Sequence, residues 1–139
     1  MLLSRKRISS LLICIILAFL MVVPAGARAS AYFSRTYVQS TDIGNGVIRI
    51  KIDLAGTGTM QEIGATQVIV YEEQSNGNYE AIRTYTREEY PSLISYNRVS
   101  HVSYITHYGT PGKSYFALCA FYAKNSTGSQ IKWGTSNAT

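Results

Sequence analysis

The alternation of aliphatic and charged residues between Gly46 and Leu54 constrains the fold of this chain most strongly. The aliphatic positions lie two residues apart and are separated by charged positions. The two sets are Ile48, Ile50, Ile52 and Leu54, and Arg49, Lys51 and Asp53. Because successive side chains of a β-strand point to opposite faces, this pattern predicts a strand with one buried face and one solvated face.

Six further segments are rich in β-branched and aromatic residues, and none carries a sustained apolar period of 3.6 residues. Turn signals separate the segments at intervals of about 10 residues, and the strongest is Gly109-Thr110-Pro111-Gly112. Thr57–Thr59, with glycines on both sides, is interpreted as a loop. The predicted strands are Thr36–Thr41, Gly46–Leu54, Gln67–Glu73, Tyr79–Thr86, Asn97–His107, Tyr115–Ala123 and Gln130–Gly134. This spacing predicts an all-β fold, an antiparallel seven-stranded β-sandwich.

The first 29 residues have the three-part layout of a secretory signal peptide. Basic residues at positions 5–7 precede an uninterrupted apolar run, Leu11–Val23, and Pro24 and small residues follow it. The run has 13 residues, whereas a helix that spans a bilayer needs about 20. We therefore expect residues 1–29 to be a signal-peptide helix that meets the membrane only transiently. Residues 30–139 are then expected to be a single secreted domain.

The small residues Ala27 and Ala29 fit a signal-peptidase site, which places the predicted cleavage between Ala29 and Ser30. Cys14 raises the alternative of a lipoprotein. It lies inside the apolar run, with further apolar residues behind it, whereas a lipid-modified cysteine becomes the first residue of the mature chain. The layout therefore favours ordinary cleavage.

The formal net charge of +5 does not point to nucleic acid as a partner. Four of the 13 basic residues lie in the predicted leader, whereas all eight acidic residues lie in the predicted domain, whose formal charge is therefore +1. The charges of the domain are also scattered along the sequence. Because a nucleic-acid binder gathers its basic residues on one surface, this class of function is excluded.

Cys119 is the one cysteine after residue 29, so no disulfide is expected within the domain. It lies in the apolar segment Tyr115–Ala123, and we expect a structural core residue, because buried thiols behave as small hydrophobic groups. His101 and His107 lack the cysteine or carboxylate neighbours that a zinc site needs, so we expect structural histidines and neither a metal nor a cofactor. The alternative is a small hydrolase in which Cys119 attacks the substrate with one of these histidines as base.

All 11 tyrosines lie after residue 29, and they are the most suggestive feature of the composition. Tyrosine favours strands, and exposed tyrosine rings also anchor protein partners or stack on sugars. The candidate ligand-binding residues are therefore Tyr71, Tyr79, Tyr85 and Tyr104. The alternative is that these rings only cover the sheets. Trp133 shares one face of the last predicted strand with Ile131 and is assigned a structural role.

Residues 100–129, SHVSYITHYGTPGKSYFALCAFYAKNSTGS, resemble the last three strands of fibronectin type III and immunoglobulin-like domains. In those domains a Pro-Gly turn precedes a tyrosine that opens the penultimate strand. Pro111, Gly112 and Tyr115 have this spacing. The resemblance implies that Tyr115 is a structural corner tyrosine whose hydroxyl bonds to nearby backbone.

A broader resemblance involves the turn Gly44-Asn45-Gly46 and the step Ile63-Gly64, which are similar to those of short uncharacterised secreted proteins of Gram-positive bacteria. It implies a location and a fold but no activity. In the absence of a catalytic set, the sequence predicts a secreted, non-enzymatic interaction module with an unknown protein or glycan partner. The alternatives are a carbohydrate-binding module that uses exposed tyrosines and the small hydrolase described above.

Overall fold

The computed structural model describes residues 30–139, and the predicted signal-peptide helix, residues 1–29, lies outside the described residues. The described part confirms an all-β fold, with six strands and one 3₁₀ turn. In chain order the elements are β1 (Phe33–Asp42), β2 (Val47–Glu73), β3 (Tyr79–Thr86), η2 (Pro91–Leu93), β4 (Ile94–Tyr108), β5 (Tyr115–Asn125) and β6 (Gly128–Thr135). Across this part of the chain, no helix has the length and apolar character needed to cross a membrane.

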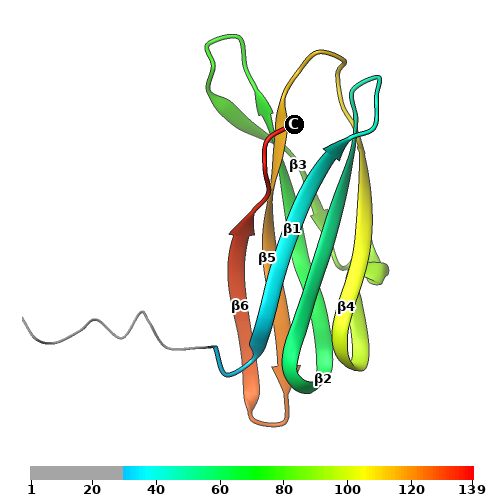
Figure 1. Ribbon diagram of the computed structural model, residues 1–139, viewed down its shortest axis with the longest axis vertical. Coiled ribbons are helices and arrows are strands. Elements are labelled where there is room, and N and C mark those ends of the chain that lie inside the picture. The colour runs from blue at the N-terminus through cyan, green and yellow to red at the C-terminus, as the bar shows by residue number, and fades with distance from the viewer. Residues whose placement is uncertain (1–29) are drawn as a thin grey trace, which may run out of the picture.

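All six strands form one antiparallel sheet organised around β2. The first half of β2 pairs with β1 and β4, and its second half pairs with β3 and β5, while the pairing with β4 extends past the turn to Gly64. The last strand, β6, continues the sheet beyond β5. Figure 1 shows β2 running down beside β1, turning at the foot of the molecule and returning upward. The sheet is thereby curled into a half-barrel whose two halves face one another.

The turn in β2 lies at a bulge between Ala55 and Met60, where the pairing register with β4 shifts. The partner strand β4 turns with β2 next to Asn97, whose φ of 54° lies in the left-handed region that asparagine tolerates. Pairing with β4 continues on both sides of the bulge. The prediction of a loop at Thr57–Thr59 is therefore wrong. The strands predicted at Gly46–Leu54 and Gln67–Glu73 are parts of one strand, β2. The sheet has six strands and not seven for this reason.

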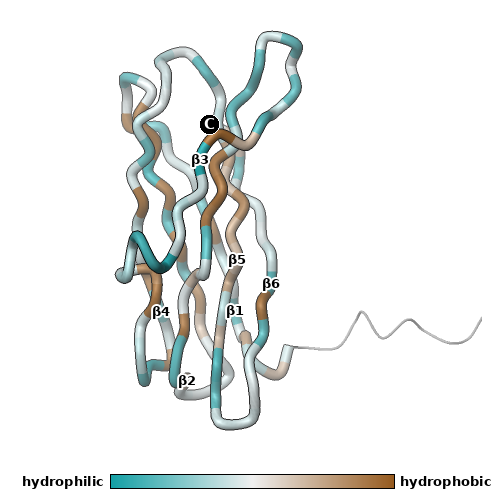
Figure 2. The backbone as a smooth tube through the Cα atoms, turned by 180° about the vertical axis from the view of Figure 1, so that it is seen from behind, coloured by the Kyte–Doolittle hydropathy of each residue, from teal (hydrophilic) through white to brown (hydrophobic). Residues whose placement is uncertain are grey.

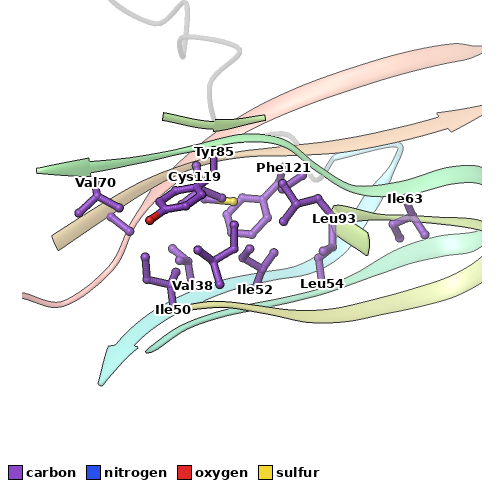
Figure 3. Close-up of a cluster of buried hydrophobic side chains, with 14 of the residues drawn as sticks. Val38, Ile50, Ile52, Leu54, Ile63, Val70, Tyr85, Leu93, Cys119 and Phe121 are labelled. Carbon is purple, nitrogen blue, oxygen red and sulfur yellow. The ribbon is translucent and has the colours of Figure 1, made fainter. Parts of the chain in front are cut away.

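The core lies between the two halves of the curled sheet. The aliphatic face predicted from the sequence alternation is buried, and Ile50, Ile52 and Leu54 have no exposed surface. Figure 3 shows side chains of this face pointing toward Cys119 and Phe121 of the opposite half. The inward side chains of β5 are all buried, namely Tyr115, Ala117, Cys119, Phe121 and Ala123. The prediction that this strand is the most buried is confirmed.

The ends of the half-barrel are closed by tight turns. Asn45 and Gly46 have φ values of 56° and 78°, and the β1–β2 hairpin predicted at this point is confirmed.

The strand β3 pairs with β2 alone in the described part of the chain, as expected of an edge strand. Figure 2 shows that the loop between β2 and β3 is hydrophilic, whereas the hydrophobic residues are concentrated along the strands.

Candidate functional site

Cys119 lies at the centre of the core and has no exposed surface. Burial raises the pKa of its thiol to about 12, so the thiol stays protonated at neutral pH. A nucleophilic cysteine needs both a thiolate and access to its substrate. Cys119 therefore occupies the core position expected from the sequence and does not supply the nucleophile that the hydrolase alternative requires.

His101 lies on the inner face of β4, with both ring nitrogens hydrogen-bonded to serine hydroxyls. Its Nδ1 is 2.7 Å from the Oγ of Ser95, and its Nε2 is 2.8 Å from the Oγ of Ser103. Burial lowers the pKa of His101, Arg98 adds to this effect, and Asp53 opposes it. The ring links the residues before and after the bend of β4, and only 3% of the residue is exposed. This geometry is that of a structural histidine.

His107 lies further along the same inner face and has one unsatisfied nitrogen. Its Nδ1 is 2.8 Å from the hydroxyl of Tyr85, whereas its buried Nε2 has no hydrogen-bond partner among the described residues. Burial lowers the pKa of His107, while Glu72 opposes this effect and Arg83 adds to it. Within residues 30–139, no group of three or more histidine, cysteine or acidic side chains is placed to hold a metal ion.

We expect the two buried histidines to make the domain less stable in mildly acidic solution. Their pKa values in the folded protein lie below the usual value of 6.5, so protonation favours unfolding. The stabilisation is complete above pH 6.5 and is lost as the pH falls through the folded pKa values. Its slope is at most about 1.4 kcal/mol per pH unit for each histidine.

Urea unfolding at a series of pH values between about 7.5 and 5 measures this slope. The variant His107→Gln should retain a hydrogen bond to Tyr85 but cannot be protonated, so its slope should be smaller than that of the parent protein. Above about pH 6, where carboxyl groups stay ionised in both states, the slope that remains is assigned to His101. An unchanged slope in His107→Gln would contradict the contribution assigned to His107.

The candidate tyrosines Tyr71 and Tyr79 lie together, at one end of the outer side of the sheet. Both contact Phe116 of β5. Tyr71 stacks on this ring with a centroid distance of 4.8 Å, and Tyr79 tilts against it at 4.9 Å. These three rings form one aromatic cluster at the surface.

The other two candidate tyrosines lie elsewhere. Tyr85 points into the core, is 6% exposed and bonds to His107, so its ring is not available to a ligand at the surface. Tyr104 is exposed on the outer side of the opposite half of the sheet, where the guanidinium of Arg49 lies over its ring at 5.8 Å. The four tyrosines named from the sequence therefore do not form one site.

The aromatic cluster continues into a larger apolar surface on the outer side of β2, β5 and β6. The pairing register places the outward side chains of these strands beside one another. We call this surface the apolar face, and its residues are Ile69, Tyr71, Phe116, Leu118, Tyr122, Ile131 and Trp133, with the fully covered Ala120 beneath them. The polar side chain of Gln67 adjoins these residues on β2, and charges border them at Tyr122, where the guanidinium of Arg87 lies over the ring at 5.6 Å and the hydroxyl donates to Glu62.

The outer side of the opposite half, formed by β1, β2 and β4, is different in charge. Its central strand presents Arg49, Lys51 and Asp53 outward, and Asp53 forms an ion pair with Lys51. Exposed apolar side chains such as Val102 and Tyr104 lie beside these charges. The two outer surfaces of the described domain therefore differ, since one is charged along its centre and the other is apolar along its centre.

Tyr115 and Trp133, both assigned structural roles from the sequence, have contrasting positions. Tyr115 is fully buried, and its hydroxyl accepts a hydrogen bond from the backbone N–H of Thr110 at 2.6 Å and donates one to Glu72 at 2.8 Å. The bond to upstream backbone is the contact that the resemblance implies for a corner tyrosine. Trp133 is about half exposed and contributes to the apolar face.

The sequence does not single out Ile69, Phe116 or Leu118, although a signal is present. The predicted strand Tyr115–Ala123 is apolar at both alternating sets of positions, a pattern that indicates burial on both sides. In the structure one of these sides is the outer surface. Pattern alone does not separate a strand covered on both sides from a strand whose outer side is an apolar surface.

The apolar face is therefore the candidate functional surface of residues 30–139. It joins Tyr71 and Tyr79, which the structure brings together on Phe116, to apolar residues of β5 and β6. No protein-family model matches the chain, and no curated protein matches its sequence.

Proposed function

We propose that the protein is an exported, non-enzymatic interaction module whose apolar face binds a partner protein outside the cell. The observation that carries this proposal is the set of neighbouring outward apolar side chains on β2, β5 and β6, which is bordered at Tyr122 by the charges of Arg87 and Glu62. Soluble proteins rarely leave large contiguous apolar patches uncovered, and such patches mark binding surfaces. Export follows from the leader predicted at residues 1–29.

The side chains of the apolar face are of the kind that protein interfaces use. Tyr71 and Phe116 stack with 3° between their ring planes, and Tyr79 packs against the pair. Rings that already hold one another lose little conformational freedom on binding, which lowers the entropic cost of association. Trp133 and Ile131 are each about half exposed, so a partner can remove substantial apolar surface from water.

We also propose that the half-barrel is an immunoglobulin-like sandwich in which β2 supplies one strand to each layer. One layer would contain β1, β4 and the first half of β2, and the other would contain β3, β5, β6 and the second half of β2. The bond between the Tyr115 hydroxyl and the Thr110 backbone supports this assignment. With β2 counted once in each layer, the domain has the expected seven strands.

A matched pair of positions tests the proposed function. Ile131 and Val102 are aliphatic strand residues with equal exposed fractions of 51%, the first on the apolar face and the second on the opposite outer side. A photoreactive amino acid is placed at each position, and crosslinking is carried out while the producing cells export the protein. We expect a discrete protein adduct from position 131 and none from position 102.

The partner identified in this way is then purified for binding measurements. We expect Ile131→Lys to weaken its binding by about 2 kcal/mol, roughly thirtyfold, because the substitution places a charge in an apolar contact. Val102→Lys should change binding by less than about threefold. Equal adducts from both positions, or no adduct from position 131, would contradict the proposed function.

A glycan is the second candidate partner, because the rings of Tyr79 and Trp133 are both substantially exposed and a sugar can stack on an exposed ring. Titration with soluble cell-wall oligosaccharides separates the two candidates. Ring-stacking shifts in the signals of Tyr79 and Trp133, together with no protein adduct from position 131, would replace the protein partner with a sugar.

A further inference from the structure

A groove of about 420 Å³ opens between the edge strands β1 and β6, on the side of the half-barrel that no strand of residues 30–139 closes. Figure 1 shows these two strands side by side, with their arrows pointing the same way. Four consecutive residues of each strand line the groove, Thr36–Gln39 and Lys132–Thr135, and Phe121 and Asn137 complete the lining.

Side-chain hydrogen bonds join the two strands at both ends of the groove. At one end the hydroxyl of Ser30 donates to the amide oxygen of Gln130 at 2.6 Å. At the other end the hydroxyls of Ser40 and Ser136 are 2.7 Å apart. The first bond lies near the start of both strands and the second lies near the end of both strands, so β1 and β6 run parallel. Between these ends no backbone ladder joins β1 to β6 in the described part of the chain.

On β1, the backbone groups of every second residue face the groove. Ser40 identifies this set, because its N–H and C=O bond to the side chain of Asn137 and not to β2. Backbone groups alternate between the two edges of a strand, so those of Val38 and Thr36 point the same way as those of Ser40. Within residues 30–139 they have no strand partner on that edge.

On β6, the same alternation leaves the backbone groups of Trp133 and Thr135 facing the groove. The N–H of Ser136 donates to the carbonyl of Ala117 at 2.8 Å, so residue 136 and every second residue before it bond toward β5. The backbone groups of the alternate residues, Trp133 and Thr135, point away from β5 and toward the groove. Two rows of backbone donors and acceptors thus face one another across the groove.

The side chain of Asn137 shows which chemistry the edge of β1 accepts. Its amide oxygen accepts a hydrogen bond from the N–H of Ser40 at 3.0 Å, and its amide nitrogen donates to the carbonyl of Ser40 at 2.9 Å. The peptide groups of a neighbouring strand would make the same pair of bonds. The side-chain amide of Asn137 therefore already occupies the place of a peptide group beside Ser40. The backbone N–H and C=O groups of Val38 and Thr36 can pair with further peptide groups in the same way.

The floor and the charge of the groove indicate the side chains of its occupant. Phe121 forms the floor beneath Gly134, where an added Cβ would come within 2.6 Å of the ring. An aromatic floor favours an apolar side chain above it. Lys132 also lines the groove and forms no ion pair with another residue of the described chain. Its free charge favours an acidic residue in the occupant.

We propose that the groove is an acceptor site for an extended segment of a partner polypeptide, which inserts as a strand between β1 and β6. A segment of about four residues matches the length of the groove. Because neighbouring strands lie about 4.8 Å apart, its insertion must move β1 and β6 apart and open the hydrogen bond between Ser40 and Ser136, after which its backbone would bond to both edges. One inward side chain of the segment packs over Phe121, and an acidic one pairs with Lys132. This site lies between the two halves of the sheet and shares only Trp133 with the apolar face.

Selection of peptides tests the site. Protein expressed from the full-length chain is used to select phage-displayed random decapeptides, and the selected peptides are synthesised and titrated into ¹⁵N-labelled protein. We expect selected peptides to be rich in β-branched and acidic residues. The largest amide shifts should fall at the groove-facing positions, namely Thr36, Val38, Trp133 and Thr135.

Two proline variants separate backbone pairing from general effects on β6. Thr135→Pro removes one groove-facing N–H without removing a bond to β5, so binding of the selected peptides should weaken about tenfold. Ser129→Pro is the matched control, because Ser129 faces the same edge of the same strand outside the groove. This control should bind the peptides as the parent protein does.

Three results would overturn the proposal: no peptide is selected, the peptide shifts fall on residues of the apolar face outside the groove such as Ile69, Leu118 and Tyr122, or Thr135→Pro binds as tightly as Ser129→Pro. Sedimentation of the protein alone adds a fourth, since self-association that protects the groove-facing amides would make a second copy the occupant. None of these results affects crosslinking from position 131, so failure of this site and failure of the proposed function are distinguishable.

Discussion

A Gly64→Ala variant should lose about 3–5 kcal/mol of the free energy of unfolding, with a fall in Tm on the order of 15 °C. Gly64 lies in β2 with a φ of 153°, a conformation that L side chains rarely adopt. A Cβ at this position would also collide with the carbonyl oxygen of Leu93, where η2 meets β4. Because the colliding atom belongs to the backbone, the clash cannot be relieved by a side-chain rotation.

Gly58→Ala provides the matched control for this substitution. Gly58 lies in the same strand, no atom would lie within 4 Å of its added Cβ, and its φ is not in the left-handed region. Its free energy of unfolding should stay within about 0.5 kcal/mol of the parent value. Thermal and urea unfolding followed by circular dichroism measure both variants. Equal stability of the two would contradict the close approach of η2 to β2.

Phe121→Ala should cost about 3–5 kcal/mol, because it removes a fully buried ring and leaves a cavity. The ring is 1% exposed and packs against the aliphatic face of the opposite half of the sheet, as Figure 3 shows. It also supports the backbone of Gly134 in β6. The ring of Phe121 therefore contributes both to the stability of the core and to the floor of the groove.

Phe116→Ala is the control for Phe121→Ala, since both positions lie in β5 but on opposite sides of it. Phe116 is partly exposed on the apolar face, so its removal should cost about 1 kcal/mol. Urea unfolding of the two variants gives the comparison. A larger loss for Phe116→Ala than for Phe121→Ala would mean that the inner and outer sides of β5 are assigned the wrong way round.

The local pattern of the strands could be predicted from the sequence, but the path of β2 could not. The alternation from Ile48 to Leu54 indicates one buried face, and this face forms the core. The glycines around Thr57–Thr59 also occur in loops, and nothing local distinguishes a loop from a bulge at which paired strands bend together. That distinction depends on β4, whose pairing partners lie about 40 residues away in the sequence.

The candidate site was predictable in part for a similar reason. The sequence named Tyr71 and Tyr79 as candidates together with Tyr85 and Tyr104, and no local pattern separated the pair that contacts Phe116 from the other two. The burial of Tyr85 follows from the turn of β2, which places β3 opposite the histidine-bearing face of β4. The groove between β1 and β6 depends on the curl of the whole sheet, and no short segment of sequence encodes that curl.

Amide hydrogen exchange in the isolated protein tests most directly that the half-barrel ends in two free strand edges available to a partner. We predict an alternating pattern, with fast exchange for the groove-facing amides of Thr36, Trp133 and Thr135 and slow exchange for Tyr37 and Gly134, which bond to β2 and β5. Uniformly slow exchange at all five amides would show that the edges are already paired, and would contradict the open groove.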